Sequence, residues 1–185
     1  MNLAESHIPD LHPLLKNRWS PRTYDPSFQL SEQEVNLLFE AARWAPSSFN
    51  AQPWRYVYAI RQQEQGFQKM IEPLMEGNKT WAKDASMLIL SLAKTDYEGR
   101  DGTNSYAQYD LGQANFSLVS QASAMGLSVR QMAGFSKSKA KELFQLPDNL
   151  IPVAYIAVGK PVEGLEKPAN RSRITQEQIV TEIVS

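Results

Sequence analysis

Hydrophobic positions along the chain follow two different periods, which predict helices and strands in turn. "LSEQEVNLLFEAARWAP" has apolar residues at helical spacing, with Ser31 as N-cap, Glu34 completing a capping box and Pro46 ending the helix. "WRYVYAI" is rich in aromatic and β-branched residues and therefore predicts a strand. A polar helical segment over residues 62–75, broken at Pro73, precedes the apolar run "ASMLILSLA". That run predicts a strand covered on both faces.

The longest helical pattern covers residues 103–127. Its small and apolar side chains recur every three or four positions, at Ala107, Leu111, Ala114, Leu118, Ala122 and Met125. Phe116 and Val119 extend the apolar character beyond one stripe. This predicts a central helix with partners on more than one side, stopped at Gly126.

After this helix the pattern predicts three more elements. "LSVRQMAGF" indicates a strand that runs into a turn at Gly134, "SKSKAKELFQL" a helix closed before Pro147, and "IPVAYIAVGKP" a strand. The remaining segment is polar and has no apolar stripe before Ile179. Helices and strands that do not alternate strictly predict a single α+β domain over residues 1–185.

Composition narrows the chemistry that the side chains can supply. The chain has no cysteine and only two histidines, His7 and His12. Thiolate nucleophiles and cysteine-ligated metals are excluded, and a Ser-His-Asp hydrolase or a multi-histidine metal site is hard to build. No GxGxxG or GxxxxGK(S/T) motif supports a fingerprint dinucleotide site or a P-loop. An enzyme of this composition is expected to take its reactivity from an organic cofactor.

Charge and hydropathy limit the partners and the location. A net charge of -1, with scattered lysines and arginines, argues against a nucleic-acid partner. The longest apolar runs, such as "MLIL", are too short to cross a bilayer, so no membrane partner is expected. The first residues lack the basic start and apolar stretch of a secretion signal, and a cytoplasmic location is expected.

Two basic clusters stand near the two ends of the chain. "NRWSPRTYDP" places Arg18, Ser20 and Arg22 at positions i, i+2 and i+4, which share one side of an extended segment. Two guanidiniums and a hydroxyl there suit a phosphate or another planar anionic edge. "NRSR" adds a second basic pair, Arg171 and Arg173. The alternative for both clusters is a set of solvated arginines.

Uncharged polar groups gather in two further stretches. "PSSFNAQPW" offers hydroxyls at Ser47 and Ser48 and amides at Asn50 and Gln52, which can edge a heterocycle without adding charge. The same groups suit an ordinary capped connection between a helix and a strand. In "RQMAGF", Gly134 permits close approach of the backbone to a ligand, and a plain turn is the alternative. Taken together, the clusters match the needs of flavin mononucleotide (FMN).

With these motifs in this order, the sequence resembles the FMN-dependent nitroreductase family. The resemblance rests on "RWSPR", "APSSFNAQPWRY", "GLSVRQMAGF" and "NRSR", and it extends from Arg18 to Arg173. It implies an α+β sandwich in which helices flank a mainly antiparallel central sheet. It also implies an intertwined homodimer with two flavins at the subunit interface, whose core the long central helix would form.

The resemblance implies roles for individual residues. Arg18 and Ser20, joined by Arg171 and Arg173, would hold the phosphate and ribityl groups. Arg22 would lie near flavin N1 and the C2 carbonyl and stabilise the reduced ring. Residues 46–50 would reach the ring partly from the partner subunit, and residues 131–134 would run along it near N5. The implied cofactor-binding residues are Arg18, Trp19, Ser20, Arg22, Pro46, Ser47, Ser48, Asn50, Asn78, Gln131, Met132, Ala133, Gly134, Arg171 and Arg173.

The implied activity is ping-pong hydride transfer from NAD(P)H to flavin N5, and onward to nitroaromatics, quinones or similar electron-poor small molecules. No side chain needs to act as a nucleophile, because the protein positions rings and stabilises charge. Two alternatives stay open: a flavin-binding sensor or reservoir without turnover, and a specialised dehalogenase or dehydrogenase on the same scaffold. Some members carry a glutamate where this chain has Ala133, so protons are expected from solvent.

Overall fold

One antiparallel sheet of four strands forms the centre of the computed structural model, which describes residues 11–168 and 171–183. The strands are β1 (Trp54–Ile60), β2 (Met87–Lys94), β3 (Ser128–Met132) and β4 (Leu150–Gly159), in the spatial order β1-β2-β4-β3. Every neighbouring pair runs antiparallel. The expected α+β fold with a mainly antiparallel sheet is confirmed.

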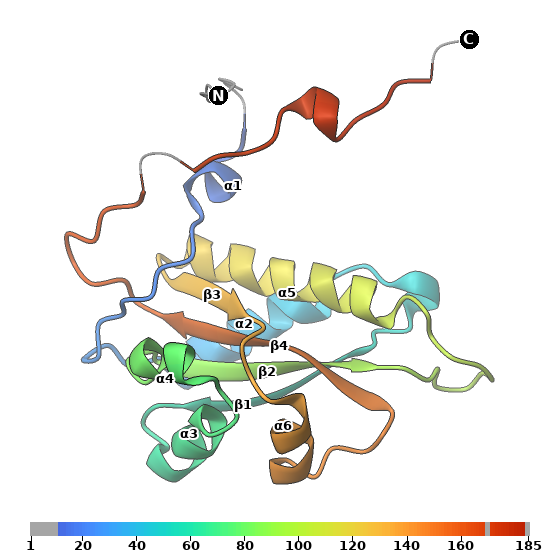
Figure 1. Cartoon of the computed structure of the whole chain (residues 1–185), viewed down its shortest axis with the longest axis horizontal. Helices are drawn as coiled ribbons and strands as arrows, with labels where there is room; N and C mark the ends of the chain where they lie inside the picture. Colours follow the sequence, from blue (N-terminus) through green and yellow to red (C-terminus); the bar gives the residue numbers. More distant parts are fainter. Residues whose placement is uncertain (1–10, 169–170, 184–185) are drawn as a thin grey trace.

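Helices cover both faces of this sheet (Figure 1). The two longest helices, α2 (Glu32–Arg43) and α5 (Ala107–Ala124), share one apolar core with the sheet. The shorter helices α3 (Glu64–Ile71), α4 (Glu76–Ala82) and α6 (Lys137–Leu143) share a second core with its other face.

Strand β2 supplies both of these cores because its side chains alternate between the two faces. Met87 and Ile89 belong to the core with α2 and α5, whereas Leu88 and Leu90 belong to the other. All four side chains are fully buried. The strand is therefore covered on both faces, as its unbroken apolar run predicts.

Helix α5 is central, as its pattern predicts. The inward stripe is buried at Ala107, Leu111, Ala114, Leu118 and Ala122. The helix ends at Ala124, and Gly126 follows with φ +73° while the N–H of Leu127 donates to the carbonyl of Ala122 at 2.9 Å. This is a Schellman end, which requires a left-handed residue. On the outer side, Tyr109 and Phe116 stay 70% and 44% exposed.

Several helix ends follow local rules, whereas others depend on contacts distant in sequence. Ser31 Oγ accepts from the N–H of Glu34 at 3.2 Å, and Glu34 Oε2 accepts from the N–H of Ser31 at 2.8 Å, which confirms the capping box. Helices α1 (Pro13–Asn17) and α4 were not expected from the sequence. The helix expected from residue 103 begins only at Ala107, because Asn104 Oδ1 accepts from the N–H of Tyr106 and closes a turn there.

The last described residues, 171–183, run beside α1 and then away from the sheet (Figure 1). They contain one short 3₁₀ turn, η2 (Gln176–Gln178). Ile179 and Ile183 are 65% and 90% exposed. Within the described ranges, no helix combines the length and apolar content that crossing a membrane requires.

Candidate functional site

Arg18 and Ser20 border a hollow of about 290 Å³ at the end of α5 nearest β3. Arg18 Nη1 donates to Ser20 Oγ at 3.3 Å, so these two side chains meet on one side of the chain, as their spacing predicts. The opposite wall consists of Phe116 and Val119 from α5 and of Val129 and Gln131 from β3. The hollow thus combines a basic edge, apolar surface and one uncharged amide.

Five arginines, Arg18, Arg22, Arg130, Arg171 and Arg173, gather around this end of the molecule. Burial lowers the pKa of Arg18, and the positive charges of Arg171 and Arg173 lower it further. Burial and the nearby Arg22 do the same to the pKa of Arg130. None of the five forms an ion pair with a carboxylate within the described residues. Uncompensated cations that repel one another are stabilised by an anion.

Arg130 belongs to this cluster although no sequence motif singles it out. Its guanidinium donates to the carbonyl of Ser20 and lies 5.6 Å from the ring centre of Trp81. It therefore fixes the backbone of the segment that carries Arg18 and Arg22. The only hint in the sequence was a positive charge directly before Gln131. The role of Arg130 depends on its contact with Ser20, which is 110 positions away and cannot be predicted from the local sequence.

Arg171 ties the C-terminal segment to the start of the chain. Its guanidinium donates to the carbonyls of Lys16 and Arg18, and Lys167 Nζ also donates to the carbonyl of Lys16 at 3.0 Å. Arg173 Nη1 donates to the carbonyl of the adjacent Ser172 at 2.8 Å. The second basic pair therefore lies beside the first, as expected, and part of its hydrogen bonding serves the chain itself.

Asn78 and Gly134 meet although they are far apart in sequence. Asn78 Nδ2 donates to the carbonyl of Gly134 at 3.0 Å, and the N–H of Met75 donates to the same oxygen at 3.0 Å. A Cβ atom added at Gly134 would lie 2.6 Å from Asn78 Nδ2. Only glycine leaves room for the Asn78 side chain at this position. The glycine is therefore required by this contact, and not only by a turn.

Residues 131–133, which precede Gly134, alternate between surface and core. Met132 is 7% exposed and packs in the second core, so only its backbone is open to a ligand. Gln131 and Ala133 are exposed on either side of it, as strand alternation requires. Trp19 is half-buried between Arg18 and Ser20.

The stretch from Pro46 to Gln52 forms a connection with its own hydrogen bonds. The N–H of Ser48 donates to Asp110 Oδ2 at 3.0 Å, and Ser47 Oγ accepts from the N–H of Gln52 at 3.0 Å. The N–H of Ser48 and the hydroxyl of Ser47 therefore stabilise the connection itself, in agreement with the alternative of an ordinary capped connection. Within the described residues the hydroxyl of Ser48 and the side-chain amide of Asn50 make no hydrogen bond, and Pro46 is exposed.

Left-handed backbone is concentrated in this connection. Phe49, Asn50 and Gln52 have φ angles of 53°, 54° and 46°, and the first two lie in the 3₁₀ turn η1 (Ser48–Asn50). Such angles are costly for residues other than glycine and persist where surrounding contacts impose them. Asp110, only 2% exposed, provides one such contact through Ser48.

A single chain does not bring the expected site residues together. Ser48 contacts Asp110 in the first turn of α5, whereas Arg18 and Ser20 share their hollow with Val119. Asp110 lies six positions before Phe116 and nine before Val119, the two residues of α5 that line the hollow. These intervals correspond to about 9–14 Å along the helix axis. Figure 1 shows η1 beside one end of α5 and the extended segment after α1 toward the other. Residues 46–50 and 18–22 therefore lie apart within one chain, and each group is called a half-site below.

Comparisons with known proteins find relatives that match most of this chain. Protein DrgA of Synechocystis sp. (strain ATCC 27184 / PCC 6803 / Kazusa) is 30% identical over 183 residues, covering 83% of this chain and 85% of that protein. The major NAD(P)H-flavin oxidoreductase of Aliivibrio fischeri is 28% identical over 188 residues, covering 94% and 78%. A crystal structure described as an oxidoreductase containing FMN has a TM-score of 0.78 at 35% identity, covering 83% of this chain and 78% of that one.

The sequence model of the Nitroreductase family matches residues 15–160. That range includes the segments of both half-sites and the contact between Asn78 and Gly134, and it stops before the second basic pair. Because the match covers well over half of a chain with the same fold, this protein belongs to the nitroreductase family.

Proposed function

We propose that this protein is an FMN-dependent NAD(P)H oxidoreductase that reduces nitroaromatics, quinones or similar electron-poor small molecules. The observation that carries the proposal is the cluster of five arginines, which have no acidic partner among the described residues, beside a hollow with an uncharged amide. Such a combination fits a molecule with a doubly charged phosphate at one end and a flat, uncharged polar ring at the other. The flavin-oxidoreductase relative and the FMN-containing structural neighbour support the same cofactor.

The residues present fit this cofactor group by group. Arg18 and Ser20 would hold the phosphate and ribityl chain, with Arg171 and Arg173 adding positive charge. Arg22 would place a cation at the pyrimidine edge, where it favours the anionic reduced ring. Bound FMN supplies a carrier that takes two electrons as hydride and releases them to a second substrate. The backbone of residues 131–134 and the amide of Asn78 would fix the ring position.

We further propose that a second copy of the chain completes each site. Residues 46–50 lie away from residues 18–22 within one chain, so a single copy cannot surround one ring with both. Helix α5 exposes Tyr109 next to Asp110 and Phe116 at the hollow of Arg18, and the segment after Arg171 carries exposed isoleucines. A homodimer packed through α5 would cover this apolar surface, in agreement with what the family resemblance implies.

The direct test starts with the purified protein and FMN. We expect uptake of about one flavin per chain, anaerobic bleaching of the yellow colour by NADPH or NADH, and recovery of the colour with a quinone. Protein that is folded by circular dichroism yet takes up no FMN would overturn the proposal. Protein that binds FMN but is reduced by neither nucleotide would instead identify the flavin-binding alternative without turnover.

A further inference from the structure

A second hollow, of about 320 Å³, lies between the connection over residues 49–52 and the loop after β2. It shares no lining residue with the hollow at Arg18. Its rim includes Phe49 and Asn50 on one side, and Tyr97 and Arg100 on the other. It therefore opens beside residues 46–50. In the proposed function these residues lie against the flavin ring of a partner subunit.

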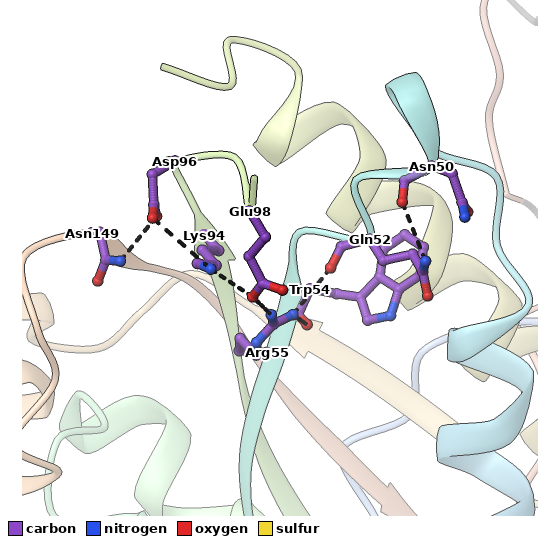
Figure 2. A network of polar contacts seen from close by, with 8 residues as sticks. All are labelled: Asn50, Gln52, Trp54, Arg55, Lys94, Asp96, Glu98 and Asn149. Atoms are coloured by element: carbon purple, nitrogen blue, oxygen red, sulfur yellow. Dashed lines mark hydrogen bonds and ion pairs between the residues drawn. The ribbon is translucent and has the colours of Figure 1, made fainter. Parts of the chain in front are cut away.

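Arg55 and Glu98 line this hollow and belong to a network in which opposite charges balance one another (Figure 2). Glu98 Oε1 lies 3.1 Å from Arg55 Nη2 and 2.7 Å from Lys94 Nζ. Lys94 Nζ also lies 3.9 Å from Asp96 Oδ2, and Asn149 Nδ2 donates to Asp96 Oδ1 at 2.9 Å. Two cations thus face two carboxylates, and this network leaves no net charge for a ligand.

Arg100 is the cation at the rim that this network does not neutralise. Its guanidinium carbon lies 4.3 Å from the ring centre of Phe49 and 4.7 Å from that of Tyr97, two rings that meet edge to face. In the part of the chain that the structure describes, Arg100 forms no ion pair. The two rings hold the guanidinium by cation–π contact and leave its positive charge unpaired.

The backbone of Phe49 keeps this arrangement at the surface. Its φ of 53° is unusual for a bulky residue, and its side chain is 77% exposed. Neither burial nor backbone preference explains a large aromatic ring held in this way. Residues in such conformations gather at functional sites, where the position of the side chain offsets the strain.

We propose that this hollow selects electron acceptors that carry an anionic group, with Arg100 pairing with a carboxylate on an aromatic ring. This inference rests on the proposed function, because residues 48–50 would place the acceptor next to the flavin. A nitrobenzoate is the simplest acceptor of this class. Its reduction to the nitroso compound consumes one NAD(P)H and one proton and yields NAD(P)⁺ and water, while the carboxylate serves only for recognition.

The test compares two acceptors that differ in charge, 4-nitrobenzoate and the neutral 4-nitrobenzamide, in anaerobic steady-state assays of the FMN-loaded protein. Arg100→Ala should raise KM for 4-nitrobenzoate roughly fivefold, the effect expected for a solvent-exposed ion pair, with kcat nearly unchanged. KM for 4-nitrobenzamide should stay at the wild-type value. Arg100→Lys should retain most of the preference, and high salt should reduce it in the wild type.

Arg43→Ala provides the matched control. Arg43 also lies over an aromatic ring, 5.6 Å from the centre of Trp44, but its charge is paired with Glu40 at 2.6 Å. Its removal should change neither KM. Calorimetric titration with 4-nitrobenzoate in the absence of reductant gives a readout apart from turnover, and Arg100→Ala should weaken that binding by the same factor.

Equal losses for the charged and the neutral acceptor would overturn the inference, since they indicate a structural role for Arg100. A rise in KM for NADPH but not for NADH, with 4-nitrobenzoate unaffected, would also overturn it, because the recognised anion would then be the nucleotide phosphate. Failure of the proposed function is seen earlier, as wild-type protein that takes up no FMN. Normal flavin binding and reduction without charge selectivity would contradict the present inference alone.

Discussion

Among single residues, Arg22 and Arg130 share a small volume although both are positively charged. The proximity of Arg22 contributes to the lowered pKa of Arg130, and neither finds a carboxylate within the described residues. Arg130 is fixed by the carbonyl of Ser20 and by the ring of Trp81, so the repulsion is not relieved by moving away. A bound anion would relieve this repulsion, which is the physical reason for the phosphate site proposed here.

Gly134 offers the sharpest single-residue test of the site. In Gly134→Ala the new methyl group meets Asn78 Nδ2, which must move and give up its bond to the carbonyl of residue 134. We expect a loss of about 1–2 kcal/mol in the free energy of unfolding, measured with urea, together with weaker FMN retention on dialysis.

Gly77→Ala is the control for this substitution. Gly77 lies in α4, next to Asn78, and a Cβ atom added there meets nothing within 4 Å. Alanine should stabilise this helix slightly, because it restricts the unfolded chain and favours helix. Equal behaviour of the two alanine variants in both measurements would contradict the role assigned to the contact between Asn78 and Gly134.

At the scale of elements, the sequence suffices where a helix or strand carries its own signals. The capping box of α2, the buried stripe and glycine stop of α5 and the unbroken apolar run of β2 all lie within one element. Helix α4 has no side-chain cap, and the N–H of Met75 at its start donates to Gly134 instead. Arg130 is similar, because its partner Ser20 is 110 residues away. Single-sequence patterns carry no information on such long-range pairs.

The contact between α5 and residues 47–52 makes a prediction at this scale. Asp110 accepts from the N–H of Ser48 while only 2% exposed, so Asp110→Ala leaves a donor without its partner and frees the connection. We expect a loss of about 1–3 kcal/mol in the free energy of unfolding. Asp110→Asn keeps an acceptor oxygen and should lose less. Gln108→Ala, at an exposed position of the same helix, is the control, and a similar loss there would contradict the assignment.

At the scale of the whole molecule, α5 separates two incomplete half-sites. One end of the molecule provides the cations, and the other provides the strained connection and the rim of the second hollow. The outer side of α5 exposes aromatic surface, with Tyr109 70% and Phe116 44% exposed. Apolar surface rarely stays uncovered beside a binding site, and isologous pairing of two copies is the commonest way in which chains cover it.

Mixed dimers test whether two chains share each site. Arg18→Ala damages the basic half-site and Asn50→Ala the other, so each variant alone should retain little FMN. In a dimer of one Arg18→Ala chain and one Asn50→Ala chain, both substitutions fall in the same site, and the second site is intact. We therefore expect about one tightly held flavin per mixed dimer, measured after co-expression with two affinity tags and dialysis. If each chain built its own site, every site in the mixed dimer would carry one substitution and no recovery would follow.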